Sequence, residues 1–462
     1  MKIRSNIEIN ENKWKEFLYV FFKENEDEVY IEINENTTYF DVKVSNTVKN
    51  ISYREEKIIE NQEDIILKTS LLKLYNKILP WGSLVGVRPT KLVRKLLEKY
   101  SYEEIENILE KVYMVTNKKA KLLINVVKNS IEYIDNDTIG IYIGLAFCPT
   151  KCTYCSFPAY LKKGKYLERY NEYFNTIIKE IDEMSNLCNE LNLPINTIYV
   201  GGGTPSFLDY NELNVFLKHI SKFNMENISE YTFEAGRIDT LDRKKLEILK
   251  EYGVTRISIN PQSFKDSTLK LVNRYHNIEK LNEVYKDSKE LDFEINMDFI
   301  IGLPKEDTQD VLNTIKELEN YEPDNITFHY LAMKKASYLT KNNYFFDKEL
   351  DYKLINDKIY EVMEKRGYIP YYLYRQKSSS IEGENVGFCK PNKQLIYNIE
   401  MIEENKTIIS IGAGAITKII TDRDITRLIN SKDPLMWVDE FEEKLNQKKE
   451  YIRGVYGKKK ER

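Results

Sequence analysis

Three cysteines within eight residues are the clearest sign of chemistry in this sequence. Cys148, Cys152 and Cys155 stand in CPTKCTYC, directly after an apolar stretch typical of a strand. A loop with gaps of three and two residues can place three thiolates around one [4Fe–4S] cubane, which leaves the fourth iron without a protein ligand. S-adenosylmethionine (SAM) can chelate that iron through its amino and carboxylate groups. An electron from the cluster can then break the sulfonium bond and release a 5′-deoxyadenosyl radical.

A structural zinc site is the alternative for the same cysteines. Zinc takes four closed ligands in such sites, and no fourth cysteine or histidine stands near the triplet. His219, His276 and His329 are scattered along the chain, although folding could bring one of them close. Cys188 and Cys389 are isolated, and we expect them to be ordinary residues. The sequence therefore favours an iron–sulfur cluster over zinc.

Alternating strands and helices after about residue 138 must position these cysteines. Because helical stretches separate the strands, the sheet should be parallel with right-handed crossovers. The pattern predicts a partial (β/α)6 TIM-like barrel, in which the chemistry gathers at the carboxyl ends of the strands. The predicted strands are IGIYIGLAF, INTIYVGG, EYTFEA, VTRISIN, EINMDFIIG and NITFHYLA.

The chain as a whole is predicted to be an α/β protein of three parts, because 462 residues exceed one ordinary core. Residues 1–135 form a small N-terminal α+β accessory domain, with a β-containing module followed by helices. Residues 136–345 form the barrel. Residues 346–462 form a C-terminal α+β domain.

Bulk charge and hydropathy give no case for a nucleic-acid or membrane partner. The net charge is -4, and no apolar run approaches the length of a membrane span. The first residues lack the apolar stretch of a signal peptide, so we expect a cytoplasmic protein. The basic residues near the end, Lys458, Lys459, Lys460 and Arg462, are expected to form a solvated tail.

The motifs around the cysteines resemble a known family. YIGLAFCPTKCTYCSF, YVGGGTPS, RISINPQSF, LVNR and NMDFIIGLP are similar to motifs of the oxygen-independent coproporphyrinogen III oxidase (HemN-like) family, within the radical SAM superfamily. LPWGSLVGVRPTK, YYLYRQK and ENVGFCKP, with IGAGA, look closest to the coproporphyrinogen dehydrogenase branch called HemZ. The superfamily resemblance covers about residues 139–335, and the branch resemblance covers nearly the whole chain. It implies a radical SAM barrel that holds a [4Fe–4S] cluster and SAM.

The resemblance implies that the first two strands end in residues that bind SAM. Tyr142 would lie near the sulfonium, and Tyr154 would stack on the adenine. A glycine run would let the backbone approach the methionine amino group, although an ordinary tight turn would need the same residues. This run with its following threonine is Gly201, Gly202, Gly203 and Thr204.

Four polar residues on later strands are implied to complete the site. Glu234 matches the buried carboxylate of the family, and Gln262 and Arg274 match a polar pair whose arginine faces a carboxylate of SAM. Asp298 matches the acid that binds the ribose. Tyr142, Glu234 and Gln262 form the implied catalytic set. The alternative for each residue is a structural hydrogen bond or a surface charge.

A porphyrinogen would bring several carboxylates and a large apolar disc to the site. Arg88, Arg375 and Lys377 lie in the accessory motifs and are candidate carboxylate partners. His329 could contact substrate or haem, or could be a structural residue. Tyrosines of YYLY could line an apolar floor or form a strand that packs on the barrel; they are Tyr371, Tyr372 and Tyr374. Gly412 and Gly414 are expected to allow close backbone packing near the cluster.

The function implied first is oxidative decarboxylation of coproporphyrinogen III to protoporphyrinogen IX. The expected partners are a porphyrinogen or haem-like small molecule and an electron donor such as flavodoxin or ferredoxin. One departure bears on this function: the family's oxidase has a further cysteine where this chain has Phe157. The alternatives are a haem-binding chaperone of the HemW type and a radical SAM methyltransferase or haem-modifying enzyme.

Overall fold

The chain divides into two compact units, Met1–Ile131 with Pro370–Val386, and Glu132–Ile369 with Gly387–Arg462. The computed structural model describes residues 1–8, 11–22, 25–332, 334, 337–342, 350–376, 384–421 and 424–457. Both units contain helices and a sheet, so the predicted α/β class is confirmed. The division into three domains stays a prediction.

The first unit is built on a small sheet with the order β1-β2-β3-β4. Along β2 and β3 buried and exposed residues alternate, so one face carries Val29, Ile31 and Val42 into a core with Phe17 and Leu71. This is the module that the alternating sequence predicts. Its elements are β1 (Lys2–Ser5), α1 (Glu11–Phe22), β2 (Glu28–Glu35), β3 (Tyr39–Ser45), β4 (Asn50–Glu56) and α2 (Glu63–Leu74).

Three helices follow in the same unit, as the helical periodicity predicts. Pro89 occupies the N-cap of the first, and Ser101 forms a capping box with Glu104 at the second. The unit also takes in the chain around Pro370–Val386. These elements are α3 (Thr90–Leu97), α4 (Tyr102–Lys111), α5 (Asn117–Lys128), β11 (Ile369–Tyr374) and the start of β12 (Asn385–Cys389).

The second unit contains the six predicted barrel strands in the order β10-β9-β8-β7-β6-β5. All five pairings between them are parallel. β5 is buried along nearly its whole length, as expected for a parallel strand covered on both faces. The strands are β5 (Ile139–Leu145), β6 (Ile195–Gly202), β7 (Glu230–Phe233), β8 (Arg256–Ser258), β9 (Glu294–Ile301) and β10 (Asn325–Tyr330).

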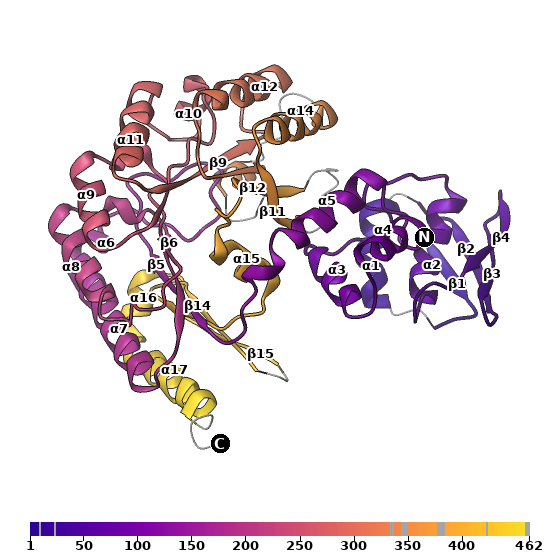
Figure 1. Ribbon diagram of the computed structural model, residues 1–462, viewed down its shortest axis with the longest axis horizontal. Helices are drawn as coiled ribbons and strands as arrows, with labels where there is room; N and C mark the ends of the chain where they lie inside the picture. The colour runs from indigo at the N-terminus through magenta and orange to yellow at the C-terminus, as the bar shows by residue number, and fades with distance from the viewer. Residues whose placement is uncertain are drawn as a thin grey trace. The chain divides into compact units, whose positions relative to one another are not determined.

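Helices lie along the outside of these strands (Figure 1). Asp209, Asp242 and Asp307 each cap the helix that follows by accepting a backbone N–H, which explains where these helices begin. The helices are α6 (Lys165–Glu168), α7 (Tyr170–Glu190), α8 (Tyr210–Ile220), α9 (Arg243–Glu251), α10 (Asp266–Leu271), α11 (Ile278–Glu290), α12 (Thr308–Glu317), α13 (Tyr338–Lys341) and α14 (Tyr352–Lys365).

The C-terminal segment extends the same sheet beyond β5. β13 (Ile408–Ile411) runs parallel to β5 and pairs Ser410 with Tyr142. The close packing predicted at Gly412 is confirmed, because a Cβ atom there would lie 2.1 Å from the carbonyl oxygen of Gly144. The remaining elements are α15 (Ile396–Glu403), β14 (Ile416–Ile420), β15 (Ile425–Ile429), α16 (Pro434–Asp439) and α17 (Phe441–Tyr456).

A buried charge fixes this extension to the outer helices. Glu180 of α7 accepts the N–H of Gly412 at 2.7 Å and the ammonium of Lys448 in α17 at 2.6 Å. Both charged side chains are about 2% exposed. β5 is thus an internal strand, paired with β6 on one side and with β13 on the other.

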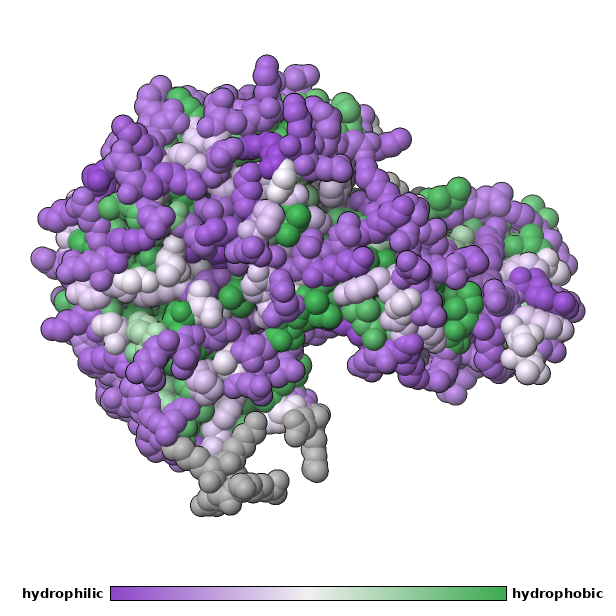
Figure 2. All heavy atoms as spheres, viewed as in Figure 1, coloured by the Kyte–Doolittle hydropathy of each residue, from purple (hydrophilic) through white to green (hydrophobic). Residues whose placement is uncertain are grey.

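The visible surface of each unit is mostly hydrophilic, with hydrophobic residues in scattered patches (Figure 2). Across the described ranges, we find no helix with both the length and the apolar character that crossing a bilayer requires.

Candidate functional site

The cysteine loop begins where β5 ends. The N–H of Cys148 donates to the carbonyl oxygen of Tyr160 at 3.0 Å, and the N–H of Cys155 donates to that of Cys152 at 3.1 Å. The hydroxyl of Thr204 donates to the sulfur of Cys148 at 3.2 Å. Burial raises the pKa of Cys148 to about 12, and the neighbouring cysteines add to this effect. The three thiols therefore lie close together, in surroundings that disfavour a free thiolate.

This donor set fits a [4Fe–4S] cluster. Three cysteines on a cubane bind three different iron atoms, so their sulfurs need not converge on one point. Among the residues that the structure describes, no group of three or more His, Cys, Asp or Glu side chains has the arrangement that a single metal ion needs. Cys188 and Cys389 are buried on α7 and β12, as ordinary residues would be. The loop thus offers three sulfurs, and a [4Fe–4S] cluster bound to them would have one iron without a cysteine ligand.

The glycine run at the end of β6 packs against the start of the cysteine loop. Gly202 has a φ of +100°, and a Cβ atom there would lie 2.5 Å from the carbonyl oxygen of Leu145. A Cβ atom at Gly203 would lie 2.5 Å from that of Phe147. At Gly201 it would lie 2.6 Å from the carboxylate of Glu234. Side chains here would push the cysteine loop and the carboxylate away from β6, so the glycines set the shape of the site.

Two carboxyl groups at this end of the sheet are close enough for the charge of one to act on the other. Glu234 directly follows β7, and Asp298 lies within β9. Burial, then the charge of Asp298, raises the pKa of Glu234 to about 8, so Glu234 is mostly protonated at neutral pH. Asn296 donates to Asp298 at 3.1 Å, and the Nε2 of His329 lies 3.8 Å from the same carboxylate oxygen. One carboxyl group can therefore donate a hydrogen bond while the other accepts.

Gln262 is held in an uncommon backbone conformation beside Asp298. Its φ is +70°, its N–H donates to the carbonyl oxygen of Asp298 at 3.0 Å, and its carbonyl oxygen accepts from Ile300 at 2.9 Å. The side-chain Oε1 is buried and has no hydrogen-bond partner among the described residues. A buried amide oxygen without a partner is unfavourable, so this atom marks a place where a bound molecule can donate a hydrogen bond.

Arg274 joins the cysteine loop to the loops after β7 and β8. It donates to the hydroxyl of Tyr154 at 3.3 Å and to the carbonyl oxygens of Gly236 and Asn260. Its Nε is buried without a hydrogen-bond partner in the described part of the chain. The structure thus brings Arg274 and Tyr154 together, and the N–H of Arg274 that remains can meet an acceptor on a ligand.

Three tyrosine rings, from β5, β6 and α15, stack on one another near Glu234. Tyr142 stacks on Tyr199 of β6 and on Tyr397 of α15, with ring centroids 6.2 and 6.0 Å apart. Tyr199 and Tyr397 stack at 4.3 Å. The sequence predicts only Tyr142 here. Tyr199 could have been found, because it stands opposite Tyr142 in the register of the neighbouring strands, whereas nothing in the sequence places Tyr397 beside them.

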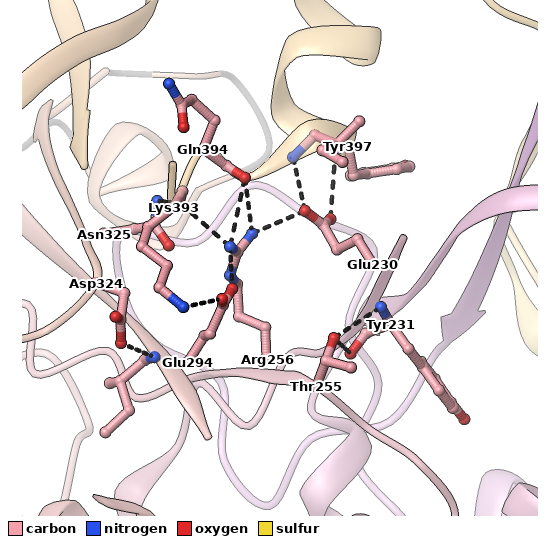
Figure 3. Close-up of polar contacts among 12 residues, drawn as sticks. Glu230, Tyr231, Thr255, Arg256, Glu294, Asp324, Asn325, Lys393, Gln394 and Tyr397 are labelled. Atoms are coloured by element: carbon pink, nitrogen blue, oxygen red, sulfur yellow. Dashed lines mark hydrogen bonds and ion pairs between the residues drawn. The ribbon is translucent and has the colours of Figure 1, made fainter. Parts of the chain in front are cut away.

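A charged network holds the start of α15 at the amino ends of β7, β8 and β9 (Figure 3). Glu230 accepts the N–H of Tyr397 at 3.3 Å and the guanidinium of Arg256 at 2.7 Å. Arg256 also donates to the carboxylate of Glu294 and to the carbonyl oxygens of Lys393 and Gln394. The first turn of α15 is therefore fixed by groups from three strands.

Arg237 is a further residue that the sequence analysis missed. It lies three residues after Glu234, and its Nη1 lies 3.6 Å from the sulfur of Cys152. No spacing pattern in the sequence predicts this contact, because a lone arginine after a strand is common. Its buried guanidinium is the only one among the described residues for which a hydrogen bond to one of the three cysteine sulfurs is found.

The accessory candidates lie in the first unit. Arg375 donates to the carbonyl oxygens of Val87 and Leu84 and lies 5.1 Å from the ring centre of Trp81. Burial lowers its pKa to about 10. Arg88 is half-buried, and Lys377 lies outside the described residues. Tyr371, Tyr372 and Tyr374 lie on β11, so YYLY forms a strand, and the role of these tyrosines as an apolar floor stays a prediction.

Known proteins resemble this chain in sequence and in fold. The family model of the radical SAM superfamily matches residues 142–318. The oxygen-independent coproporphyrinogen-III oxidase-like protein HemZ of Bacillus subtilis is 38% identical over 393 residues, which cover 82% of this chain and 78% of that protein. The heme chaperone HemW of Buchnera aphidicola from Schizaphis graminum is 28% identical over 297 residues, covering 64% of this chain and 74% of its own.

A solved structure shows the fold. The coproporphyrinogen III oxidase HemN from Escherichia coli, a radical SAM enzyme, superposes with a TM-score of 0.54 at 19% identity, over 67% of this chain and 70% of that one. The resemblance that the motifs predict is confirmed. Because identity to HemZ extends over most of the chain, the chain belongs to the HemZ family of oxygen-independent coproporphyrinogen-III oxidase-like proteins, within the radical SAM superfamily.

Proposed function

We propose that this protein binds a [4Fe–4S] cluster on Cys148, Cys152 and Cys155, binds SAM beside it, and oxidatively decarboxylates coproporphyrinogen III to protoporphyrinogen IX. The observation that carries the proposal is the gathering, at one end of a single sheet, of three cysteine thiols and of buried polar atoms that have no hydrogen-bond partner among the described residues. The identity to HemZ of Bacillus subtilis, which is named as an oxygen-independent coproporphyrinogen-III oxidase-like protein, supports the choice of substrate.

The bound cluster and SAM would supply a carbon-centred radical that takes a hydrogen atom from the substrate. Each of the two propionates that react then loses that hydrogen atom, carbon dioxide and one electron, and becomes a vinyl group, while the other two propionates stay intact. The electron passes to an acceptor, and a donor such as flavodoxin or ferredoxin would return the cluster to its reduced state.

The chain's own residues would bind and orient SAM. The backbone at Gly201, Gly202 and Gly203, with Thr204, would contact the methionine part of SAM. Gln262 Oε1 and Arg274 Nε offer an acceptor and a donor that the protein itself leaves unused among the described residues.

The remaining residues would set the polarity of the site. Asp298 would accept the ribose hydroxyls, while Glu234 holds a proton on its carboxyl group at neutral pH. Tyr154 would lie on the adenine. Tyr142, fixed in its stack, would face the sulfonium.

Anaerobic turnover tests this function. The reconstituted protein is incubated with SAM, dithionite and coproporphyrinogen III, and the products are identified by mass spectrometry. We expect 5′-deoxyadenosine and a porphyrinogen that has lost two carboxyl groups. Formation of 5′-deoxyadenosine with an unchanged porphyrinogen would contradict the proposed substrate. Absence of both products from protein with a full cluster would contradict the radical chemistry.

A haem chaperone is the second candidate, because Phe157 replaces the further cysteine of the family's oxidase and HemW proteins are among the relatives. The side chain of Phe157 is 64% exposed beside the cysteine loop. Tight haem binding without turnover of coproporphyrinogen III, lost in His329→Ala, would favour this function over decarboxylation. S-adenosylhomocysteine among the products would instead indicate methyl transfer.

A further inference from the structure

Arg237 occupies a buried position against the cysteine loop. It is 3% exposed and follows β7 in the loop that begins with Glu234. Its Nη1 lies 3.6 Å from the sulfur of Cys152, 2.8 Å from the hydroxyl of Thr150 and 3.3 Å from the carbonyl oxygen of Asn273. One guanidinium nitrogen therefore meets a cysteine sulfur, a hydroxyl of the same loop and a carbonyl oxygen outside the loop.

Asp239 fixes the direction of this guanidinium. Its two carboxylate oxygens accept from the Nε and Nη2 of Arg237 at 2.8 and 2.6 Å, in the two-pronged geometry that holds an arginine rigidly. Burial opposes ionisation of Asp239, but the hydrogen bonds and charge of Arg237 lower its pKa below the usual value. The pair is therefore ionised, with the positive end towards Cys152 and the negative end away from it.

This arrangement bears directly on a cluster bound to Cys152. Reduction adds one negative charge to the cluster and its thiolates. A charged N–H donor at a ligand sulfur stabilises the more negative form, and hydrogen bonds to the sulfurs are among the factors that set cluster potentials. The effect is large in a buried site, because little water screens it.

We propose that Arg237 raises the reduction potential of the cluster through its hydrogen bond to Cys152, and that Asp239 orients Arg237 and offsets part of its charge. The inference rests on the proposed cluster and assigns a role to two residues outside the cysteine triplet and the SAM pocket. With this pair in place, the cluster would accept more readily the electron that starts the reaction.

The pair allows two substitutions with opposite expected effects. Arg237→Gln removes the positive charge, so the midpoint potential should fall. Asp239→Asn removes the charge that offsets Arg237, so the potential should rise. The potential is read from the electron paramagnetic resonance signal of the reduced cluster during titration with dithionite, without SAM. Arg243→Gln is the matched control, because Arg243 on α9 is a surface arginine paired with Glu247, Asp287 and Glu290, and its loss should leave the potential unchanged.

Further variants distinguish the effect of the charge of Arg237 from its structural support of the cysteine loop. Arg237→Lys keeps the charge, so it should lower the potential less than Arg237→Gln does. The double variant Arg237→Gln with Asp239→Asn leaves no buried unpaired charge and serves if the single variants fold poorly; its potential should lie below that of Asp239→Asn. Shifts of the same sign in both single variants, or loss of iron with an unchanged potential in the protein that remains loaded, would overturn the inference.

The result is distinguishable from failure of the proposed function. If the wild-type protein yields no [4Fe–4S] signal after anaerobic loading, the cluster proposal itself is wrong. If the wild-type cluster forms and cleaves SAM but Arg237→Gln leaves its potential in place, the cluster stands and the role of Arg237 is wrong.

Discussion

The two ends of the large sheet use buried polar groups in opposite ways. At the amino ends of the strands, Glu230 faces Arg256 and two backbone N–H groups, and each counteracts the rise in its pKa that burial causes. At the carboxyl ends, Glu234 has Asp298 as its strongest charged neighbour, which raises its pKa further. At the amino end Glu230 has a cation and backbone donors as partners, whereas at the carboxyl end Glu234 has an acidic neighbour instead.

The polar groups at the amino end hold α15 in place, whereas we expect those at the carboxyl end to bind a ligand. The network around Arg256 holds α15 in place and thereby seats Tyr397 against Tyr142. The opposite end keeps Gln262 Oε1 and Arg274 Nε buried without hydrogen-bond partners among the described residues. Because such atoms destabilise a protein unless a ligand satisfies them, we expect substitutions at the two ends to have different consequences.

The largest expected effect is loss of the cluster. Cys155→Ala should abolish the visible absorbance of the reconstituted protein and reduce 5′-deoxyadenosine to background, because two cysteines do not hold a cubane stably. The unfolding free energy of the metal-free protein should change little. Cys188→Ala is the control: Cys188 is buried on α7, so that variant should keep the cluster. Full SAM cleavage by Cys155→Ala would refute the site.

At the amino end, the expected loss is one of stability. Arg256→Gln should lower the free energy of unfolding by about 3–5 kcal/mol, because it leaves Glu230 buried without its cation. Adding Glu230→Gln should restore part of this. Lys393→Gln, which removes a half-exposed partner of Glu294, should change it by about 1 kcal/mol or less. Chemical denaturation measures all three, and equal effects of Arg256→Gln and Lys393→Gln would contradict the comparison.

A third effect is pH dependence at the carboxyl end. Glu306, in the loop after β9, bonds to Ser263, and burial raises its pKa from 4.5 to about 7. The folded protein therefore binds more protons than the unfolded chain in this window. Stability should fall as pH rises from about 4.5 to about 7, by on the order of 3 kcal/mol from this group.

Replacing this carboxyl group tests the pH effect. Glu306→Gln should flatten that part of the profile of unfolding free energy against pH in the metal-free protein. Glu247→Gln, at an exposed position on α9, should leave the profile as it is. A wild-type profile that rises through the window, or an unchanged slope in Glu306→Gln, would count against the assignment.

The smallest expected effect is that of Gln262→Gly, which should stabilise the protein slightly and weaken binding of SAM. Gln262→Gly should relieve the positive φ and raise the free energy of unfolding by about 1 kcal/mol. It should also raise the KM for SAM, because the amide is gone. Asn392→Gly, at an exposed turn with a φ of +64°, should stabilise without changing that KM. Unchanged SAM kinetics in Gln262→Gly would show that the amide does not face the ligand.

The strands and the motifs at their ends could be predicted from the sequence because both are local. The position of Cys148 after β5, of Gly202 at the end of β6 and of Gln262 after β8 follows from counting along each strand–loop segment. Once the strands run parallel, their carboxyl ends meet, so residues distant in sequence fall into one site.

The contacts that the sequence analysis missed are all long-range. Arg237 and Cys152 are separated by 85 residues, and the hydrogen bond between them leaves no periodic trace. Tyr397 reaches Tyr142 because Glu230 and Arg256 fix the start of α15, and a lone glutamate or arginine on a strand has many other uses. The pairing of β13 with β5 could not be predicted for a similar reason, because the sequence of a strand does not determine which strand lies beside it.

The pairing of β5 with β13 has a consequence for synthesis of the protein. While the ribosome is still making the middle of the chain, β5 lacks its neighbour on one side, and the strand that leads into the cysteine loop is an exposed edge. It becomes internal only when residues 408–411 have emerged. The nascent chain therefore completes the support of its cysteine loop late, and iron that reached the loop before that point would meet a strand with one edge still open to solvent.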